Sequence, residues 1–251
     1  MFRTMAALAA AVAVAVAGAS AATAATAAPA QGSTEEASFL AFVEPTQAST
    51  IQARFTVPAV NCTGSTGIED ATALVNALSG LGLDHRADAR TGPGKVAVAG
   101  LLISRADVMA SCDAGLAVYQ ALALGIPLAM TVSPGDKVLL TASFDPSTQQ
   151  RTATVDDLTT GVALTQTSQD KGGFQPLTDF AGVQRVKRDP VPDFGTIHWS
   201  GVRINGAPIS PAIFLLRFNL IASIAHPQVL IRTSPLSRAD DAFTNTWAAS
   251  S

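Results

Sequence analysis

The chain has 251 residues, of which 14% are charged, and its formal net charge is −3. Its few lysines and arginines are dispersed, apart from the run at 185–188, which Asp189 and Asp193 balance. This excludes the clustered basic surface that nucleic-acid binding needs. Two cysteines and three scattered histidines, His85, His198 and His226, lack the spacing of metal ligands, so we expect no metal and no other cofactor.

Residues 1–28 predict a secretory signal peptide. Arg3 supplies a positive charge, Met5 to Ala17 form an uncharged apolar run, and small residues with Ala-x-Ala spacing follow. This order is typical of a cleaved signal peptide, and the run is shorter than the ~20 residues of a membrane span. We therefore expect a secreted, extracellular protein whose mature chain begins between Ala22 and Gln31. An N-terminal membrane anchor is the alternative.

Residues 29–37 are expected to be disordered, and residues 38–251 to form one domain. Short runs of alternating apolar and polar residues, separated by Gly, Pro, Asp and Ser clusters, predict an all-β protein with a two-sheet antiparallel sandwich. Two further segments, residues 68–83 and 114–124, carry helix formers and are open between helix and buried strand. The clearest predicted strands are residues 50–57, a meander over 138–167, and residues 195–199, 229–233 and 243–247.

Cys62 and Cys112 are the two cysteines of the chain. In a protein directed to an oxidising compartment, a pair of cysteines predicts a disulfide. Closing a loop of about 50 residues would stabilise the fold by roughly 4 kcal/mol on the chain-entropy estimate. A pair of buried free thiols is the alternative.

Several motifs follow one another in a characteristic order along the chain. They are RFTVPAVNC at 54–62, GLD at 82–84, SC at 111–112, VSPGD at 132–136, DDLTTG at 156–161 and PDFGTI at 192–197. In this order and spacing they resemble the bacterial branch of the eqolisins, the glutamic peptidases. The resemblance implies a concanavalin-like or jelly-roll sandwich with a groove across its concave sheet, and it places a disulfide at the two cysteines.

The resemblance also implies a catalytic pair that this sequence lacks. Eqolisins cleave peptide bonds at acid pH with a glutamate, acting as general base and acid, and a glutamine that stabilises the oxyanion. The glutamine position falls on Val98, and the glutamate position on Val183, Gln184 or Val186, depending on register. No glutamate follows Glu69, so no change of register supplies the base.

The groove is expected to retain only a few polar residues. Asp84 matches a family position, while the family's groove tryptophan and glutamate fall near Leu122 and Leu124. The neighbouring Asp84 and His85 are interpreted as a turn rather than a catalytic pair, and no Gly-x-Ser-x-Gly motif supports a serine triad. The candidate groove residues are Asp84, Val98, Tyr119, Gln120 and Gln184.

These observations predict a monomeric, secreted pseudoenzyme of the glutamic peptidase type that holds a peptide or protein segment in the old groove. The first alternative is an active acid endopeptidase with a displaced carboxylate, such as Asp84, Asp179 or Asp189. The second is a lectin-like or wall-associated binding module, against which the low aromatic content argues, with one Tyr and two Trp.

Overall fold

The computed structural model describes residues 30–34, 37–43, 50–63, 71–84, 104–169, 174–185, 190–209, 213–223, 225, 227–237, 239 and 241–248. Within these ranges the chain forms sixteen strands. They are β1 Ala30–Thr34, β2 Ala37–Val43, β3 Thr50–Thr56, β4 Ala71–Asp84, β5 Ser104–Asp113, β6 Leu116–Ala123, β7 Ile126–Pro127, β8 Lys137–Asp145, β9 Gln150–Asp157, β10 Val162–Gln169, β11 Phe174–Arg185, β12 Thr196–Ile204, β13 Ala207–Pro208, β14 Phe214–Ile221, β15 Val229–Thr233 and β16 Phe243–Trp247.

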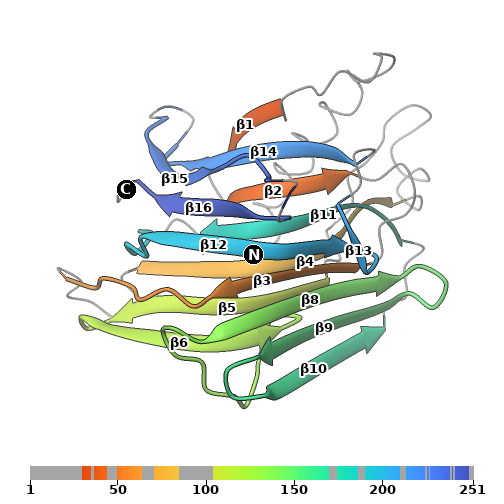
Figure 1. The fold of residues 1–251 in the computed structure, drawn as a ribbon, viewed down its shortest axis with the longest axis horizontal. Coiled ribbons are helices and arrows are strands. Elements are labelled where there is room, and N and C mark those ends of the chain that lie inside the picture. The colour runs from red at the N-terminus through yellow and green to blue at the C-terminus, as the bar shows by residue number, and fades with distance from the viewer. Residues whose placement is uncertain are drawn as a thin grey trace.

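The strands form two sheets that pack face to face and are joined at β12 (Figure 1). The front sheet has the order β10-β9-β8-β3-β12, and the back sheet continues from β12 as β16-β15-β14-β2-β11-β4-β5-β6-β7. Strands β8 and β9 of the front sheet lie against β4 and β5 of the back sheet. Apart from β1, which runs parallel to β14, the described strands pair antiparallel, so the predicted antiparallel sandwich is confirmed.

Alternate residues of the facing strands make the core. In β8 the side chains of Val138, Leu140, Ala142 and Phe144 are buried, and the residues between them are partly exposed. This period of two follows from the strand itself, because successive side chains point to opposite faces of a sheet. The meander predicted over residues 138–167 is accordingly observed as β8, β9 and β10.

A buried polar network lies beside β12, where the two sheets join. Trp199 is 1% exposed, stacks on Phe243 with ring centroids 5.5 Å apart, and donates its indole N–H to Asn245 Oδ1 at 2.7 Å. The amide nitrogen of Asn245 donates in turn to the Ser38 carbonyl at 3.2 Å and to Thr233 Oγ1 at 2.9 Å. Buried polar groups are costly unless bonded, so this network fixes how the neighbouring strands meet.

The two segments that were open between helix and strand are strands. Residues 68–83 contribute to β4, and residues 114–124 contain β6. Tight turns flank β6, because Ala114-Gly115 and Leu124-Gly125 all have positive φ, between 48° and 80°. Two consecutive residues with positive φ form the type I′ turn that joins antiparallel strands, so these turns enforce hairpins despite the helix-forming composition.

The N-terminal part differs from one expectation. Residues 29–37 were expected to be disordered, but Ala30–Thr34 form β1, which pairs along the edge of β14. Backbone pairing to an available strand edge does not require an alternating apolar pattern, which is why the sequence gives no sign of it. The predicted signal peptide, residues 1–28, lies outside the described residues. Within the described part, no helix is long and apolar enough to cross a membrane.

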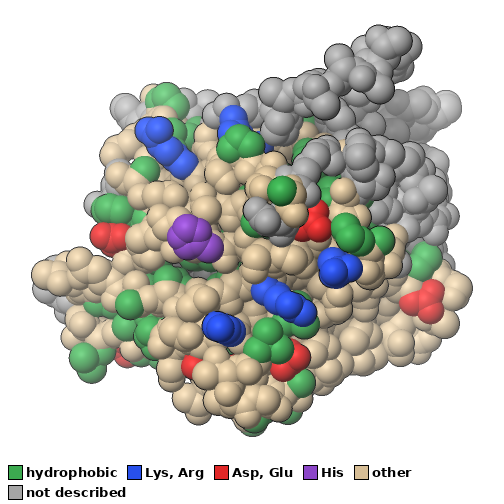
Figure 2. Space-filling model, in the orientation of Figure 1, with side chains coloured by type: hydrophobic (Ala, Val, Ile, Leu, Met, Phe, Trp, Pro, Cys, Tyr) green, Lys and Arg blue, Asp and Glu red, His purple; other side chains and the backbone are tan. Residues whose placement is uncertain are grey.

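The outer face of the front sheet is polar (Figure 2). Threonines face one another across its strands, and the hydroxyls of Thr154 and Thr165 are 2.8 Å apart. Lysine and arginine side chains gather over the middle of this face in Figure 2, and the exposed Arg54 and Arg203 belong to it by register. A solvated face of this kind is the usual outer side of an antiparallel sandwich.

Candidate functional site on the outer face of the back sheet

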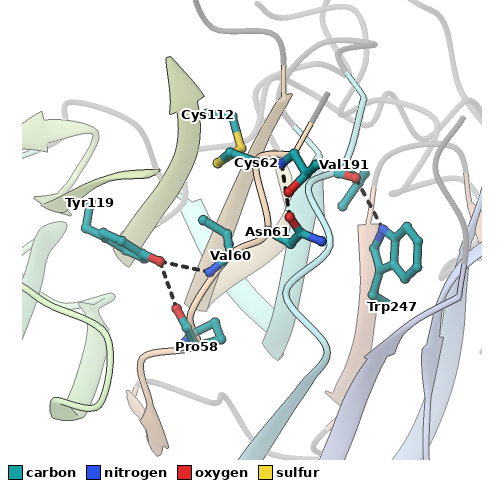
Figure 3. Close-up of a disulfide and its surroundings, with 9 residues drawn as sticks. Pro58, Val60, Asn61, Cys62, Cys112, Tyr119, Val191 and Trp247 are labelled. Carbon is teal, nitrogen blue, oxygen red and sulfur yellow. Dashed lines mark hydrogen bonds between the residues drawn. A yellow bond between two sulfur atoms is a disulfide. The ribbon is translucent and has the colours of Figure 1, made fainter. Parts of the chain in front are cut away.

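A loop after β3, Pro58–Cys62, links the two sheets and is called the clamp loop below (Figure 3). Cys62 forms a disulfide with Cys112 of β5, with the two Cα atoms 5.5 Å apart, so the predicted disulfide is confirmed. Tyr119 of β6 adds a second link, because its hydroxyl donates to the Pro58 carbonyl at 3.1 Å and accepts from the Val60 N–H at 3.0 Å.

The clamp loop also bonds to the segment that leads into β12. The backbone N–H of Asn61 donates to the Asp193 carbonyl at 2.8 Å. Near this point the indole of Trp247 donates to the Val191 carbonyl at 3.3 Å (Figure 3). The segment that leads into β12, the end of β5 and the middle of β6 are therefore linked to the same loop.

On β5, the residues that alternate with the core point to the outer face of the back sheet. Ala106 and Val108 belong to the core, so Arg105, Asp107 and Met109 face outward. Gln120 of β6 lies directly across from Met109.

The same alternation holds on β11. Ala181 and Val183 join the core, so Phe180, Gly182 and Gln184 face outward. Strand β4 runs between β5 and β11, and its residue 74 pairs with both Met109 and Gln184. Gln120 and Gln184 therefore lie in one row across this face, three strand spacings or about 14 Å apart.

Arg105 and Asp107 form an ion pair on this face. Arg105 Nε lies 2.9 Å from Asp107 Oδ2, and the Asp107 side chain is fully buried while that of Arg105 is 22% exposed. A buried carboxylate is costly unless a charge or hydrogen bonds compensate it, and the guanidinium supplies that compensation. The Leu124-Gly125 turn lies beside the pair, because a Cβ on Gly125 would stand 3.8 Å from Arg105 Nη2.

The region beyond β4 on this face is filled by aromatic rings. Phe39 meets Phe180 edge-on with centroids 5.0 Å apart and stacks on Phe218 at 4.7 Å. The three rings are between 2% and 5% exposed. Gly182 lies under Phe39, since a Cβ at position 182 would come within 2.6 Å of Phe39 Cβ. This part of the face is packed and has no room for a larger side chain at position 182.

The structure separates the predicted groove residues. Gln120 and Gln184 share the outer face and are both partly buried. Tyr119 points to the opposite, inner side, where its hydroxyl is used by the clamp loop. Asp84 is the last residue of β4, opposite residue 174 of β11, and Val98 lies outside the described residues. Of the alternatives for the glutamate position, Val183 belongs to the core, Gln184 faces outward, and Val186 lies outside the described residues.

Sequence reasoning missed the Arg105–Asp107 pair. Its only signal is an Arg-x-Asp spacing, which puts both side chains on one face if the segment is a strand. The sequence did not predict a strand over residues 104–113, so the spacing could not show that the two side chains lie on one face. The pair is the strongest concentration of charge on the outer face that the described residues present.

Three other carboxylates lie away from this face. Asp179 of β11 is fully buried and pairs in register with Phe42 of the core, so it faces inward. Asp157 closes the β9–β10 turn: burial alone would raise its pKa, but hydrogen bonds donated by Thr160 and Thr159 outweigh burial and lower the pKa.

Asp145 plays the corresponding part in the β8–β9 turn. Hydrogen bonds donated by the hydroxyls of Ser147 and Thr148, with their backbone N–H groups, lower the pKa of Asp145 to about 2. Both turn carboxylates are thus engaged in local structure. Among the described residues no three His, Cys, Asp or Glu side chains come together as a metal site would require.

Fold and site together define a two-sheet antiparallel β-sandwich. A disulfide links its two sheets, and the ion pair of Arg105 and Asp107 lies on one outer face. Residues 39–211 match the profile of the Peptidase A4 family. The chain therefore belongs to this family, the eqolisins or glutamic peptidases. The resemblance found in the motifs is thereby confirmed.

Solved structures of eqolisins share the fold. The structure of SCP-B, an eqolisin in complex with the tripeptide Ala-Ile-His, matches 85% of this chain and 98% of its own, with 14% identity and a TM-score of 0.60. Scytalido-glutamic peptidase with a transition-state analogue gives the same coverage, 13% identity and a TM-score of 0.59. No curated protein matches the sequence.

Proposed function

We propose that this chain is a secreted, catalytically inactive member of the glutamic peptidase family that holds a peptide or protein segment on the outer face of the back sheet. The observation that carries the proposal is the composition of β11. The family resemblance puts the catalytic glutamate on the strand before Asp193-Phe194-Gly195, and β11 is the described strand nearest before this motif. The chain has no glutamate after Glu69, so β11 has none in any register.

The packing around β11 supports the same conclusion. The outward positions of this strand carry Phe180, Gly182 and Gln184, none of which can accept a proton from water as a general base. Phe39 covers Gly182, and the neighbouring rings exclude solvent. A base, a water and a substrate carbonyl need a shared space, and this part of the face is filled.

The glutamine has no counterpart in the sequence either. The resemblance puts it at Val98, between Gly82-Leu83-Asp84 and β5, and a valine has no amide. Val98 itself lies outside the described residues, and the outward residues of the following strand β5 include no amide. An oxyanion needs a positioned neutral or cationic donor, but without a base such a donor cannot hydrolyse a peptide bond alone.

Binding remains compatible with this face. Met109, Gln120 and Gln184 are partly exposed in one row and offer an apolar thioether between two amides. Side-chain amides can bond both the N–H and the C=O of a peptide backbone. The relative SCP-B was crystallised with a tripeptide, which makes a peptide the first ligand to test.

The decisive experiment is a digestion assay on the purified mature protein. Acid-denatured haemoglobin is incubated with it at each unit of pH from 2 to 7, and fragments are measured by mass spectrometry against a buffer blank. We expect no fragments above the blank at any pH. Fragments that increase in proportion to the amount of purified protein would overturn the proposed inactivity.

A second candidate function is an acid endopeptidase that uses a displaced carboxylate. One observation favours it: Asp107 is an acid on the outer face, one row from Gln120 and Gln184. Its complete burial and its ion pair with Arg105 argue against a base that must reach water. If digestion is observed, Asp107→Asn decides, because this enzyme would lose its activity, whereas a base at Asp84 or Asp189 would leave it unchanged.

A further inference from the structure

Arg105 differs from the other arginines of the described strands in how it is held. Its Nε is bonded to a carboxylate that is fully buried, and its backbone carbonyl accepts the N–H of Leu124 at 2.8 Å. The backbone and the guanidinium of Arg105 are thus both held, while 22% of the side chain is exposed. A fixed cation that keeps solvent access has already lost the rotamer freedom that binding an anion would otherwise cost.

The shape of the guanidinium determines what it can bind. Asp107 engages the Nε edge, and the two terminal nitrogens carry the remaining N–H donors of a planar fork. Two parallel N–H groups match the two oxygens of a carboxylate, which is why arginine binds this group bidentately. Asp107 is therefore a positioning residue, and Arg105 would make the contact.

The surface that leads to Arg105 suits an extended chain. Along β5 and β6 the outer face passes Met109 and Gln120 and reaches Val118, which is 42% exposed, and Leu116, which is 71% exposed. Val118 lies across from Ser111, six residues along β5 from Arg105, a distance of about 20 Å. An extended hexapeptide has this length, so one peptide can span the strip of outer face that runs from Arg105 to Val118.

The end of the strip favours a chain terminus over a side chain. Arg105 is the second residue of β5, and the Leu124-Gly125 turn stands beside its guanidinium. The strip therefore ends at Arg105 and this turn.

We infer that Arg105, positioned by Asp107, binds the C-terminal carboxylate of an extended peptide whose other, apolar end lies over Val118. The inference rests on the proposed function, since it names the ligand class for the same face.

The test compares three fluorescein-labelled pools of random hexapeptides built from uncharged residues. One pool has free C-terminal carboxylates, one has C-terminal amides, and one has amides with a single glutamate in the sequence. Binding to the full mature protein is measured by fluorescence anisotropy up to 1 mM protein. The variants are Arg105→Lys and the double variant Arg105→Gln/Asp107→Asn, which leaves no unpaired buried charge; Arg54→Gln, on the other outer face, is the matched control.

We expect the wild type and Arg54→Gln to bind the free acids about tenfold more tightly than the amides, as a charge-assisted pair allows. The double variant should bind both pools with the wild-type affinity for amides, and Arg105→Lys should fall between. Equal wild-type affinities for free acids and amides overturn the inference and leave the proposed function standing. Glutamate-containing amides that bind as tightly as free acids overturn the C-terminal assignment. Absence of binding by all pools overturns peptide binding itself. If the double variant fails to fold, the wild-type comparison still decides.

Discussion

Removing the disulfide should cost more stability than any other change to the clamp loop. The bridge joins residues 50 apart in sequence and links a loop of the front sheet to β5 of the back sheet. On the chain-entropy estimate, closing a loop of this length lowers the conformational entropy of the unfolded chain, which stabilises the folded state by about 4 kcal/mol at 25 °C. Cys62→Ala/Cys112→Ala should therefore lower the free energy of unfolding by about that amount.

The assay is urea unfolding followed by tryptophan fluorescence. Trp199 is buried in the network beside β12, and Trp247 bonds to the segment next to the clamp loop, so both rings report on the junction of the sheets. With an m value of about 2–3 kcal/mol/M, the midpoint should fall by roughly 1.3–2 M.

Reduced wild-type protein separates the covalent link from side-chain packing. It keeps both sulfur atoms, so a loss equal to that of the double variant assigns the effect to loop closure. A loss under about 1 kcal/mol in the double variant would refute the reasoning, because it would mean that the unfolded chain is little affected by the bridge. A large loss in the variant but not in the reduced protein would assign the effect to packing instead.

Three further changes test the structure at other points. Tyr119→Phe removes a hydroxyl that satisfies two backbone groups of the clamp loop, and should cost about 1 kcal/mol in the same urea assay; no change would mean that water replaces both bonds. Asp157→Asn should cost about 1–3 kcal/mol at pH 6, since a carboxylate accepts charge-assisted bonds from Thr160 and its neighbour. The pKa of Asp157 is lowered in the fold, so its contribution is complete above the unfolded value of about 3.9 and is lost as the pH falls through the folded pKa. The difference from wild type should shrink in unfolding curves taken below pH 4, and a constant difference would contradict this. Gly182→Ala should cost about 1–3 kcal/mol, because its Cβ would press on Phe39 and the backbone beside it; an unchanged melting curve would show that the face is looser than described.

Much of the fold follows from local pattern, and the exceptions have identifiable causes. The β8–β10 meander alternates strictly and is bounded by turn residues, so its prediction needed no tertiary information. β6 is rich in alanine and leucine, which favour helices, and only the turns at Ala114-Gly115 and Leu124-Gly125 reveal the hairpins.

β11 was not predicted for a different reason. It is buried on both faces over residues 179–183, so its sequence shows Asp179 followed by the apolar run 180–183 in place of alternation. Such a run does not reveal which residues face the core and which face outward. The register of Val183 and Gln184 against the family's glutamate therefore stayed open in the sequence, and the two faces are distinguished only by the strands that pack against each side.

The alternation of strands also explains how the proposed loss of the dyad is compatible with the family's fold. On β11, Ala181 and Val183 face the core and hold the sheets together, while Gln184, on the other side, takes no part in that packing. Gly182 is an exception among the outward residues, because Phe39 packs on it. The links between the sheets, namely the disulfide and the Tyr119 hydroxyl, also lie on the inner side. Outward residues can therefore change without loosening the sandwich, provided that each new buried group is satisfied.

Asp107 illustrates how a buried polar group on the outer face must be satisfied. A carboxylate with no exposure persists on the outer face because Arg105, two residues earlier on the same strand, compensates its charge. The pair must therefore change together or not at all: the single change Arg105→Gln should destabilise the protein more than the double change Arg105→Gln/Asp107→Asn, although the double change alters more atoms. This ordering distinguishes a coupled pair from two independent surface residues, for which the two losses would simply add.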